Sequence, residues 1–151
     1  MVRGTKEGTA EMKEIWKALF DKITGDSTLM AMLGNDPEMV RRGYNPDEAP
    51  FSDTKTGAVL FRQWTGVPIS PGVPVTDFNF MVVGVSKKSD VQATDIAERL
   101  KVILDRAQLT ATGGYFYSCL FDAYDTGPQW VEDDDAWEED LRFRIIATHD
   151  V

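Results

Sequence analysis

What this 151-residue sequence lacks excludes several classes of protein. It has one cysteine, Cys119, so no disulfide can form within the chain, which fits a protein made in a reducing cytoplasm. Its one histidine, His149, lies two residues from the end, where chains fray, so we expect neither a catalytic triad nor a zinc site there. No apolar run approaches the roughly 20 residues that cross a bilayer, and the N-terminal segment lacks a signal-peptide core. We therefore expect a soluble protein with no membrane partner.

Catalytic signatures are also missing. No serine stands in G-x-S-x-G, and no G-x-x-x-x-G-K-[ST] loop is present. One acidic cluster could hold a divalent ion or act as acid and base: Glu132, Asp133, Asp134, Asp135, Glu138, Glu139 and Asp140. It lacks the spacing and the central glycine of an EF-hand, and consecutive side chains of an extended segment point to opposite faces. We predict that it forms an acidic surface used in an assembly; a solvated loop and a metal site remain alternatives.

Basic residues are scarce and unevenly placed. The chain has 16 Lys and Arg against 25 Asp and Glu, for a net charge of −9. Nearly all of this excess lies in residues 113–151, whose net charge is −8. Such a segment repels a phosphate backbone, which argues against ordinary nucleic-acid binding. It remains compatible with a surface that DNA must pass without adhering.

Two amphipathic helices are predicted. Apolar residues recur at spacings of three and four from Met12 to Ile23, and Gly25 ends this helix. A second apolar stripe follows the capping box formed by Ser89 and Gln92, and runs from Ala93 to Leu104. A shorter helix is expected between them, over residues 27–33.

Four stretches have the composition of strands: residues 58–64, 77–86, 115–123 and 137–148. Residues 40–42 form a possible short edge strand within an irregular connection. In the last strand apolar residues alternate with charged ones, so that the two sets face opposite sides of the sheet. These elements predict one α+β domain over residues 1–151, a mostly antiparallel sheet of about four strands with two main helices packed on one face.

Two features are candidate contact surfaces. Residues 65–76 carry Pro68, Pro71 and Pro74, and this spacing favours an extended backbone without ladder donors. We expect a protruding loop or hairpin tip, either solvated or used as an arm that contacts a partner. Trp130, beside Pro128 in a predicted surface loop, is the aromatic residue that best fits an interface anchor.

The order of these elements resembles the tail terminator, or tail completion, proteins of long-tailed bacteriophages. The similarity rests on three stretches: RRGYNPDEAP after the first helix, DVQATDIAERLKVILDRAQL over residues 90–109, and LRFRIIA in the closing strand. It covers about 60 residues from the second helix onward, and earlier it lies only in order and spacing. The proline-rich residues 68–74 form a long insertion relative to that pattern.

The resemblance implies a virion structural protein rather than an enzyme, with no cofactor. Such proteins form a ring, usually a hexamer, which caps the tail tube, docks to the head–tail connector protein and lets DNA pass through without specific binding. The expected partners are therefore further copies of the chain, the tail tube protein and the connector. Its place is the tail or neck of the virion, after assembly in the host cytoplasm.

Three alternatives are kept beside this hypothesis. Another head–tail connector or minor tail component would belong to the same class. A metal-dependent hydrolase would use the acidic cluster for catalysis. An acidic adaptor that mimics DNA would occupy a nuclease or a repressor. Mass in solution, with and without a divalent ion, discriminates the first class from the hydrolase.

Overall fold

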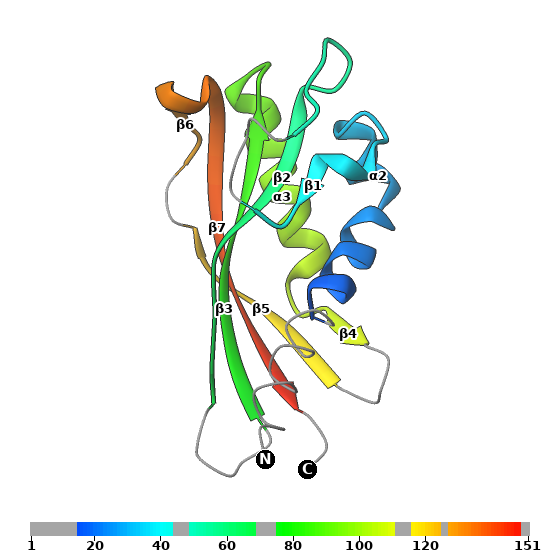
Figure 1. The fold of residues 1–151 in the computed structure, drawn as a ribbon, viewed down its shortest axis with the longest axis vertical. Helices are drawn as coiled ribbons and strands as arrows, with labels where there is room; N and C mark the ends of the chain where they lie inside the picture. Colours follow the sequence, from blue (N-terminus) through cyan, green and yellow to red (C-terminus); the bar gives the residue numbers. More distant parts are fainter. Residues whose placement is uncertain (1–14, 44–48, 69–74, 111–115, 125–126, 149–151) are drawn as a thin grey trace.

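The computed structural model describes residues 15–43, 49–68, 75–110, 116–124 and 127–148, which form the predicted α+β fold (Figure 1). A helix over residues 15–24 comes first. The later elements are α2 (Ser27–Met32), η1 (Pro37–Met39), β1 (Val40–Arg41), β2 (Gly57–Pro68), β3 (Val75–Ser86), α3 (Asp90–Leu104), β4 (Gln108–Thr110), β5 (Phe116–Tyr124), β6 (Gln129–Val131), η3 (Glu132–Asp134) and β7 (Ala136–Thr148). None of the described helices is long and apolar enough to cross a membrane.

The strands form one seven-stranded sheet in the order β1-β2-β3-β7-β5-β4, with β6 paired to β7 beyond this path. All pairs are antiparallel except β1 with β2. The 13-residue strand β7 is central, since it pairs with β3 from Trp137 to Thr148 and with β6 and then β5 on its other side. The sheet is larger than the predicted four strands because the three shortest strands, β1, β4 and β6, lie at its margins.

An aromatic row marks the sheet face that the helices cover. Trp16, from the first helix, meets Phe61 edge-on at a ring-centroid distance of 5.0 Å. Phe61 then lies 5.6 Å from Phe80, and Phe80 stacks 5.7 Å from Phe143. Phe143 also contacts Phe121 at 5.6 Å. One row therefore joins the first helix to β2, β3, β7 and β5, and Figure 1 shows the first helix and α3 on the same side of the sheet. This confirms the predicted packing.

Helix α3 approaches the sheet closely at one position. Its buried residues Ala93, Ile96, Ala97, Leu100 and Leu104 are those that the sequence stripe predicts. At Gly84 in β3, a Cβ atom would lie 2.9 Å from the carbonyl oxygen of Ala93 and 3.2 Å from the amide nitrogen of Ala97. Only glycine leaves room for the helix backbone at this distance.

The helix boundaries follow the predicted signals. The amide of Gly25 donates to the carbonyl of Asp21 (2.9 Å) as the first helix ends. Ser89 caps α3, because its hydroxyl accepts from the amide of Gln92 (3.1 Å). Asp26 caps α2 and also accepts from Nε and Nη2 of Arg99, at 2.9 and 2.7 Å. The Arg99 guanidinium holds the pKa of the Asp26 carboxyl below its usual range and ties α2 to α3.

The strands extend further into residues 65–76 than the prediction of a protruding loop or hairpin tip implies. Strand β2 continues to Pro68 and β3 begins at Val75, with Thr65 opposite Asn79 and Pro68 opposite Thr76. Pro68 is tolerated because β2 is an edge strand at this level, where a missing amide donor can face outward. Pro71 and Pro74, like Met12 and His149, lie outside the described residues.

Candidate functional site

The predicted acidic cluster divides into an exposed turn and a buried pair. The acidic turn, residues 132–135, consists of η3 and its C-cap Asp135, which adopts a left-handed conformation (φ 49°). Glu132, Asp133 and Asp135 are exposed, and Asp134 is half-buried. The turn is held to the sheet by Lys87, whose Nζ donates to the carbonyl oxygen of Asp134 (2.7 Å). It lies at one end of the molecule, beside β6 (Figure 1).

Glu138 and Glu139 do not belong to that surface, and the prediction that placed them there is wrong. They are only 5% and 4% exposed, although both are acidic. The reason is their position inside β7, where β3 and β6 flank the backbone and α3 covers one face. Neighbouring side chains on a strand point to opposite faces, so each carboxyl group enters a different covered region.

Glu139 lies between the sheet and α3. Its Oε1 accepts from the hydroxyl of Thr94 (3.2 Å), whereas its Oε2 is buried without a hydrogen bond. Burial raises the pKa of the Glu139 carboxyl, and the nearby charges of Glu98 and Asp140 raise it further, against the opposing effect of Thr94. The folded chain therefore disfavours the ionised form of Glu139.

This burial predicts a pH-dependent stability. The pKa of Glu139 is higher in the folded chain than in the unfolded chain. The protonated side chain therefore adds to the free energy of unfolding below the unfolded pKa, and this stabilisation is lost as pH rises through the folded pKa. Glu139→Gln should therefore raise the melting temperature at pH 7 by about 2–4 °C, which is about 1 kcal/mol for a chain of this size. The gain should shrink toward pH 4. Glu132→Gln, the same change at an exposed site, serves as the control in thermal melts; equal shifts for both variants would contradict the assignment.

The negative charge of Asp140, the last residue of the predicted cluster, is balanced by an arginine. It forms an ion pair with Nη2 of Arg62 across the sheet face opposite the aromatic row. Further along the sheet, Arg144 holds Asp77 through Nε (2.9 Å) and Nη2 (2.7 Å) in a bidentate pair. Charges of both signs thus alternate on this face, whereas Glu132, Asp133 and Asp135 are exposed close together in the acidic turn.

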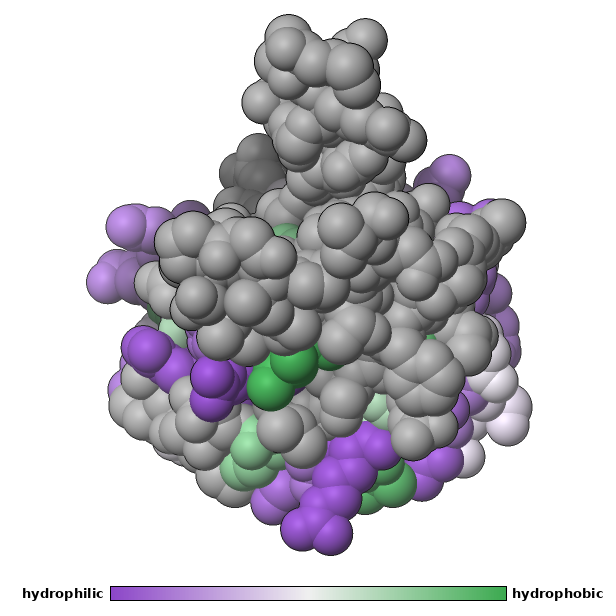
Figure 2. Space-filling model, turned by 90° about the horizontal axis from the view of Figure 1, so that it is seen from below, coloured by the Kyte–Doolittle hydropathy of each residue, from purple (hydrophilic) through white to green (hydrophobic). Residues whose placement is uncertain are grey.

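Trp130 lies in the short strand β6 rather than in the predicted surface loop, and its side chain is partly exposed. It is 47% exposed and meets Trp137 edge-on across the β6–β7 pair, at 5.5 Å between ring centroids. Val91 and Val102 on α3 are the other large apolar side chains that are exposed in the described part. At the end of the molecule opposite the acidic turn, the described surface is mostly hydrophilic with small apolar areas (Figure 2). Pro68 belongs to β2, and its side chain is not described.

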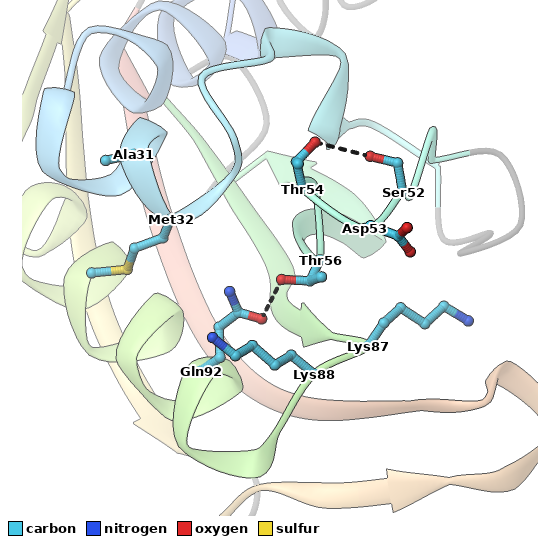
Figure 3. Close-up of a pocket in the computed structure, with 9 residues that line it drawn as sticks. All are labelled: Ala31, Met32, Ser52, Asp53, Thr54, Thr56, Lys87, Lys88 and Gln92. Carbon is cyan, nitrogen blue, oxygen red and sulfur yellow. Dashed lines mark hydrogen bonds between the residues drawn. The ribbon is translucent and has the colours of Figure 1, made fainter.

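A polar hollow of about 620 Å³ lies near the acidic turn, and the sequence did not reveal it. It is lined by the end of α2, by the lysine pair Lys87 and Lys88, by Gln92 at the start of α3, and by residues 52–54 and 56 (Figure 3). Oε1 of Gln92 accepts from the hydroxyls of Thr56 (3.1 Å) and Ser86, which fixes its side chain at the wall. In the sequence these lysines look like ordinary solvated residues, since the lining comes from segments that only the fold brings together.

The described carboxylates are not gathered into one cluster. Within residues 15–148, excluding the undescribed gaps, no three His, Cys, Asp or Glu side chains are grouped so that they could hold a metal ion. The three exposed carboxylates of the acidic turn point outward from a single helical turn, and the two buried glutamates lie on opposite faces of β7.

Comparison with known proteins gives a fold and no family. No protein-family model and no curated protein matches the sequence. Among solved structures, this chain is similar to a chain of the virion of a native gene transfer agent (GTA) particle, with a TM-score of 0.68 and 16% sequence identity. The superposition covers 86% of this chain and 91% of that chain. The two chains share a fold over nearly their full lengths.

Proposed function

We propose that this chain is a virion structural protein that forms a ring at the end of a phage tail tube and joins the tail to the head connector. The observation that carries the proposal is the fold shared with a chain of a gene transfer agent virion, over 86% of this chain. The sequence resemblance to tail terminators points independently to the same class of particle.

The distribution of charge supports a ring through which DNA passes. Paired charges neutralise the sheet face around Arg62 and Asp140, whereas exposed carboxylates lie together in the acidic turn at one end. In a ring whose copies stand side by side, these turns would surround one opening. Repulsion between the carboxylates and the phosphate backbone would then keep the duplex from adhering there. The proposed acidic part of the passage is thus its rim, formed by residues 132–135, rather than the whole wall.

A head–tail connector or minor tail component would use the same fold and remains an alternative within the proposed class. The metal-dependent hydrolase makes a different prediction for divalent ions. An ion held by the native state stabilises it by about 2.7 kcal/mol at 100 times its Kd. We expect millimolar Mg²⁺ or Ca²⁺ to leave the melting temperature within about 1 °C of the value in EDTA. A rise of several degrees that Asp133→Asn abolishes would favour the hydrolase instead.

Trp130 is proposed as an anchor for a neighbouring virion subunit. It is exposed, aromatic and backed by Trp137, which are features of residues that dominate interfaces. Trp130→Ala should weaken association by about 2 kcal/mol, measured as the concentration dependence of sedimentation. Val102→Ala, which truncates an even more exposed residue on α3, is the matched control. Unchanged sedimentation of the Trp130 variant would remove this residue from the interface.

A further inference from the structure

The polar hollow between α2 and α3 offers hydrogen-bond donors to an acidic ligand. The ammonium group of Lys88 makes no hydrogen bond or ion pair within the described residues, and it lines the hollow beside Gln92 (Figure 3). The Oε1 atom of Gln92 is already occupied, which leaves its NH₂ group available to an acceptor. Ser52 and Thr54 add hydroxyls, and Asp53 is the single carboxylate of the lining. The net charge of the lining is positive in a chain that is otherwise acidic.

The acidic turn has the complementary chemistry. The side chains of Glu132, Asp133 and Asp135 are exposed and have no hydrogen bond or ion pair to any described residue. None of the residues of the turn lines the hollow of its own chain, because Lys87 holds the turn outside it through the Asp134 carbonyl. Each copy thus presents a donor-rich hollow and an acidic turn, and the exposed carboxylates of the turn do not bind the hollow of the same chain.

The positions of the two features suit a ring. The acidic turn lies beside β6, and the end of α2 and the start of α3, which contribute to the lining of the hollow, lie at the same end of the long axis (Figure 1). A rotation about an axis parallel to the long axis would bring the turn of one copy to the hollow of the next, without a step along that axis. Head-to-tail contacts that repeat without such a step close into a ring, whereas a step would produce a helical filament.

We propose that the acidic turn of one copy docks into the hollow between α2 and α3 of the next copy, with Asp133 facing Lys88. This inference rests on the proposed ring and names the contact that closes it. In a 3₁₀ turn successive side chains point about 120° apart, so those that face away from the hollow stay at the opening. The same turn therefore serves both the contact and the acidic rim.

Charge reversal on each side of the contact tests the proposal. Lys88→Glu places a carboxylate opposite Asp133, and Asp133→Lys places an ammonium opposite Lys88. Juxtaposed like charges at an interface cost several kcal/mol, so each variant alone should assemble at least about tenfold more weakly than the original chain. An equimolar mixture of the two should assemble again. In alternating copies, one contact joins the introduced ammonium to the introduced carboxylate, and the next contact keeps the original Asp133 and Lys88. Sedimentation velocity measures all three samples.

The controls separate failure of this contact from failure of the ring. Lys17→Glu makes the same charge change at an exposed position of the first helix and should assemble normally. Normal assembly of both reversed variants, or a mixture that does not recover, would overturn the proposed contact while leaving the ring intact. An original chain that stays monomeric at every concentration tested would overturn the ring and the contact together.

Discussion

Leu100→Asp is expected to abolish cooperative folding. Leu100 is fully buried between α3 and the sheet, in the middle of the apolar stripe. An aspartate there would bury a charge without a partner, at a cost of about 3–5 kcal/mol. That is a large part of the roughly 5–15 kcal/mol by which a typical domain is stable. Thermal unfolding followed by circular dichroism should lose its sharp transition.

Val102→Asp is the matched control for that change. It introduces the same side chain on the same helix, two residues away, where Val102 is 66% exposed. Its melting temperature should stay close to that of the original chain. If the Leu100 variant also melted cooperatively at the original temperature, the packing of α3 against the sheet would be wrong.

Gly84→Val has the second largest expected effect. The new Cβ would lie 2.9 Å from the backbone oxygen of Ala93 and 3.1 Å from Cγ2 of Ile96. The backbone of α3 cannot change its conformation locally as a flexible side chain can. The whole helix must therefore move away from β3. We expect a loss of about 2–3 kcal/mol, typical of overpacking in a tight core.

Denaturant unfolding of this variant measures the loss. The control is Gly127→Val, because a Cβ at Gly127 meets nothing within 4 Å and the residue is exposed. A normal unfolding midpoint for Gly84→Val would show that α3 does not approach the sheet as closely as the structure places it.

The elements that the sequence predicts well are those specified by local pattern. The α3 stripe, its Ser89 cap and the alternation of Leu141, Phe143 and Ile145 with exposed arginines need only periodicity, and the structure confirms them. The sequence predicts a loop or hairpin tip at Pro68, because proline disfavours strands and is tolerated only where one edge of the strand is open; in the structure Pro68 ends β2. Which edge of β2 is open depends on the order of the strands in the sheet. The local sequence of residues 65–76 does not specify that order.

The candidate surface was harder to predict for a related reason. The burial of Glu138 and Glu139 depends on β3, β6 and α3, which are distant in sequence, whereas their composition alone suggests an exposed acidic run. The hollow with Lys87 and Lys88 depends on segments from Ala31 to Gln92 meeting at one end of the sheet. The exposure of the acidic turn and of Trp130 could be predicted from the sequence, because both depend on local composition.

Negative-stain electron microscopy of the purified chain decides whether this fold builds a ring. We predict rings of uniform diameter, each with a central opening wide enough for duplex DNA. The rings should persist when a chelator is added, since no metal is part of the proposed assembly. Small compact particles of single-chain size, without an opening at every concentration tested, would contradict the proposal that this fold builds a ring in a virion.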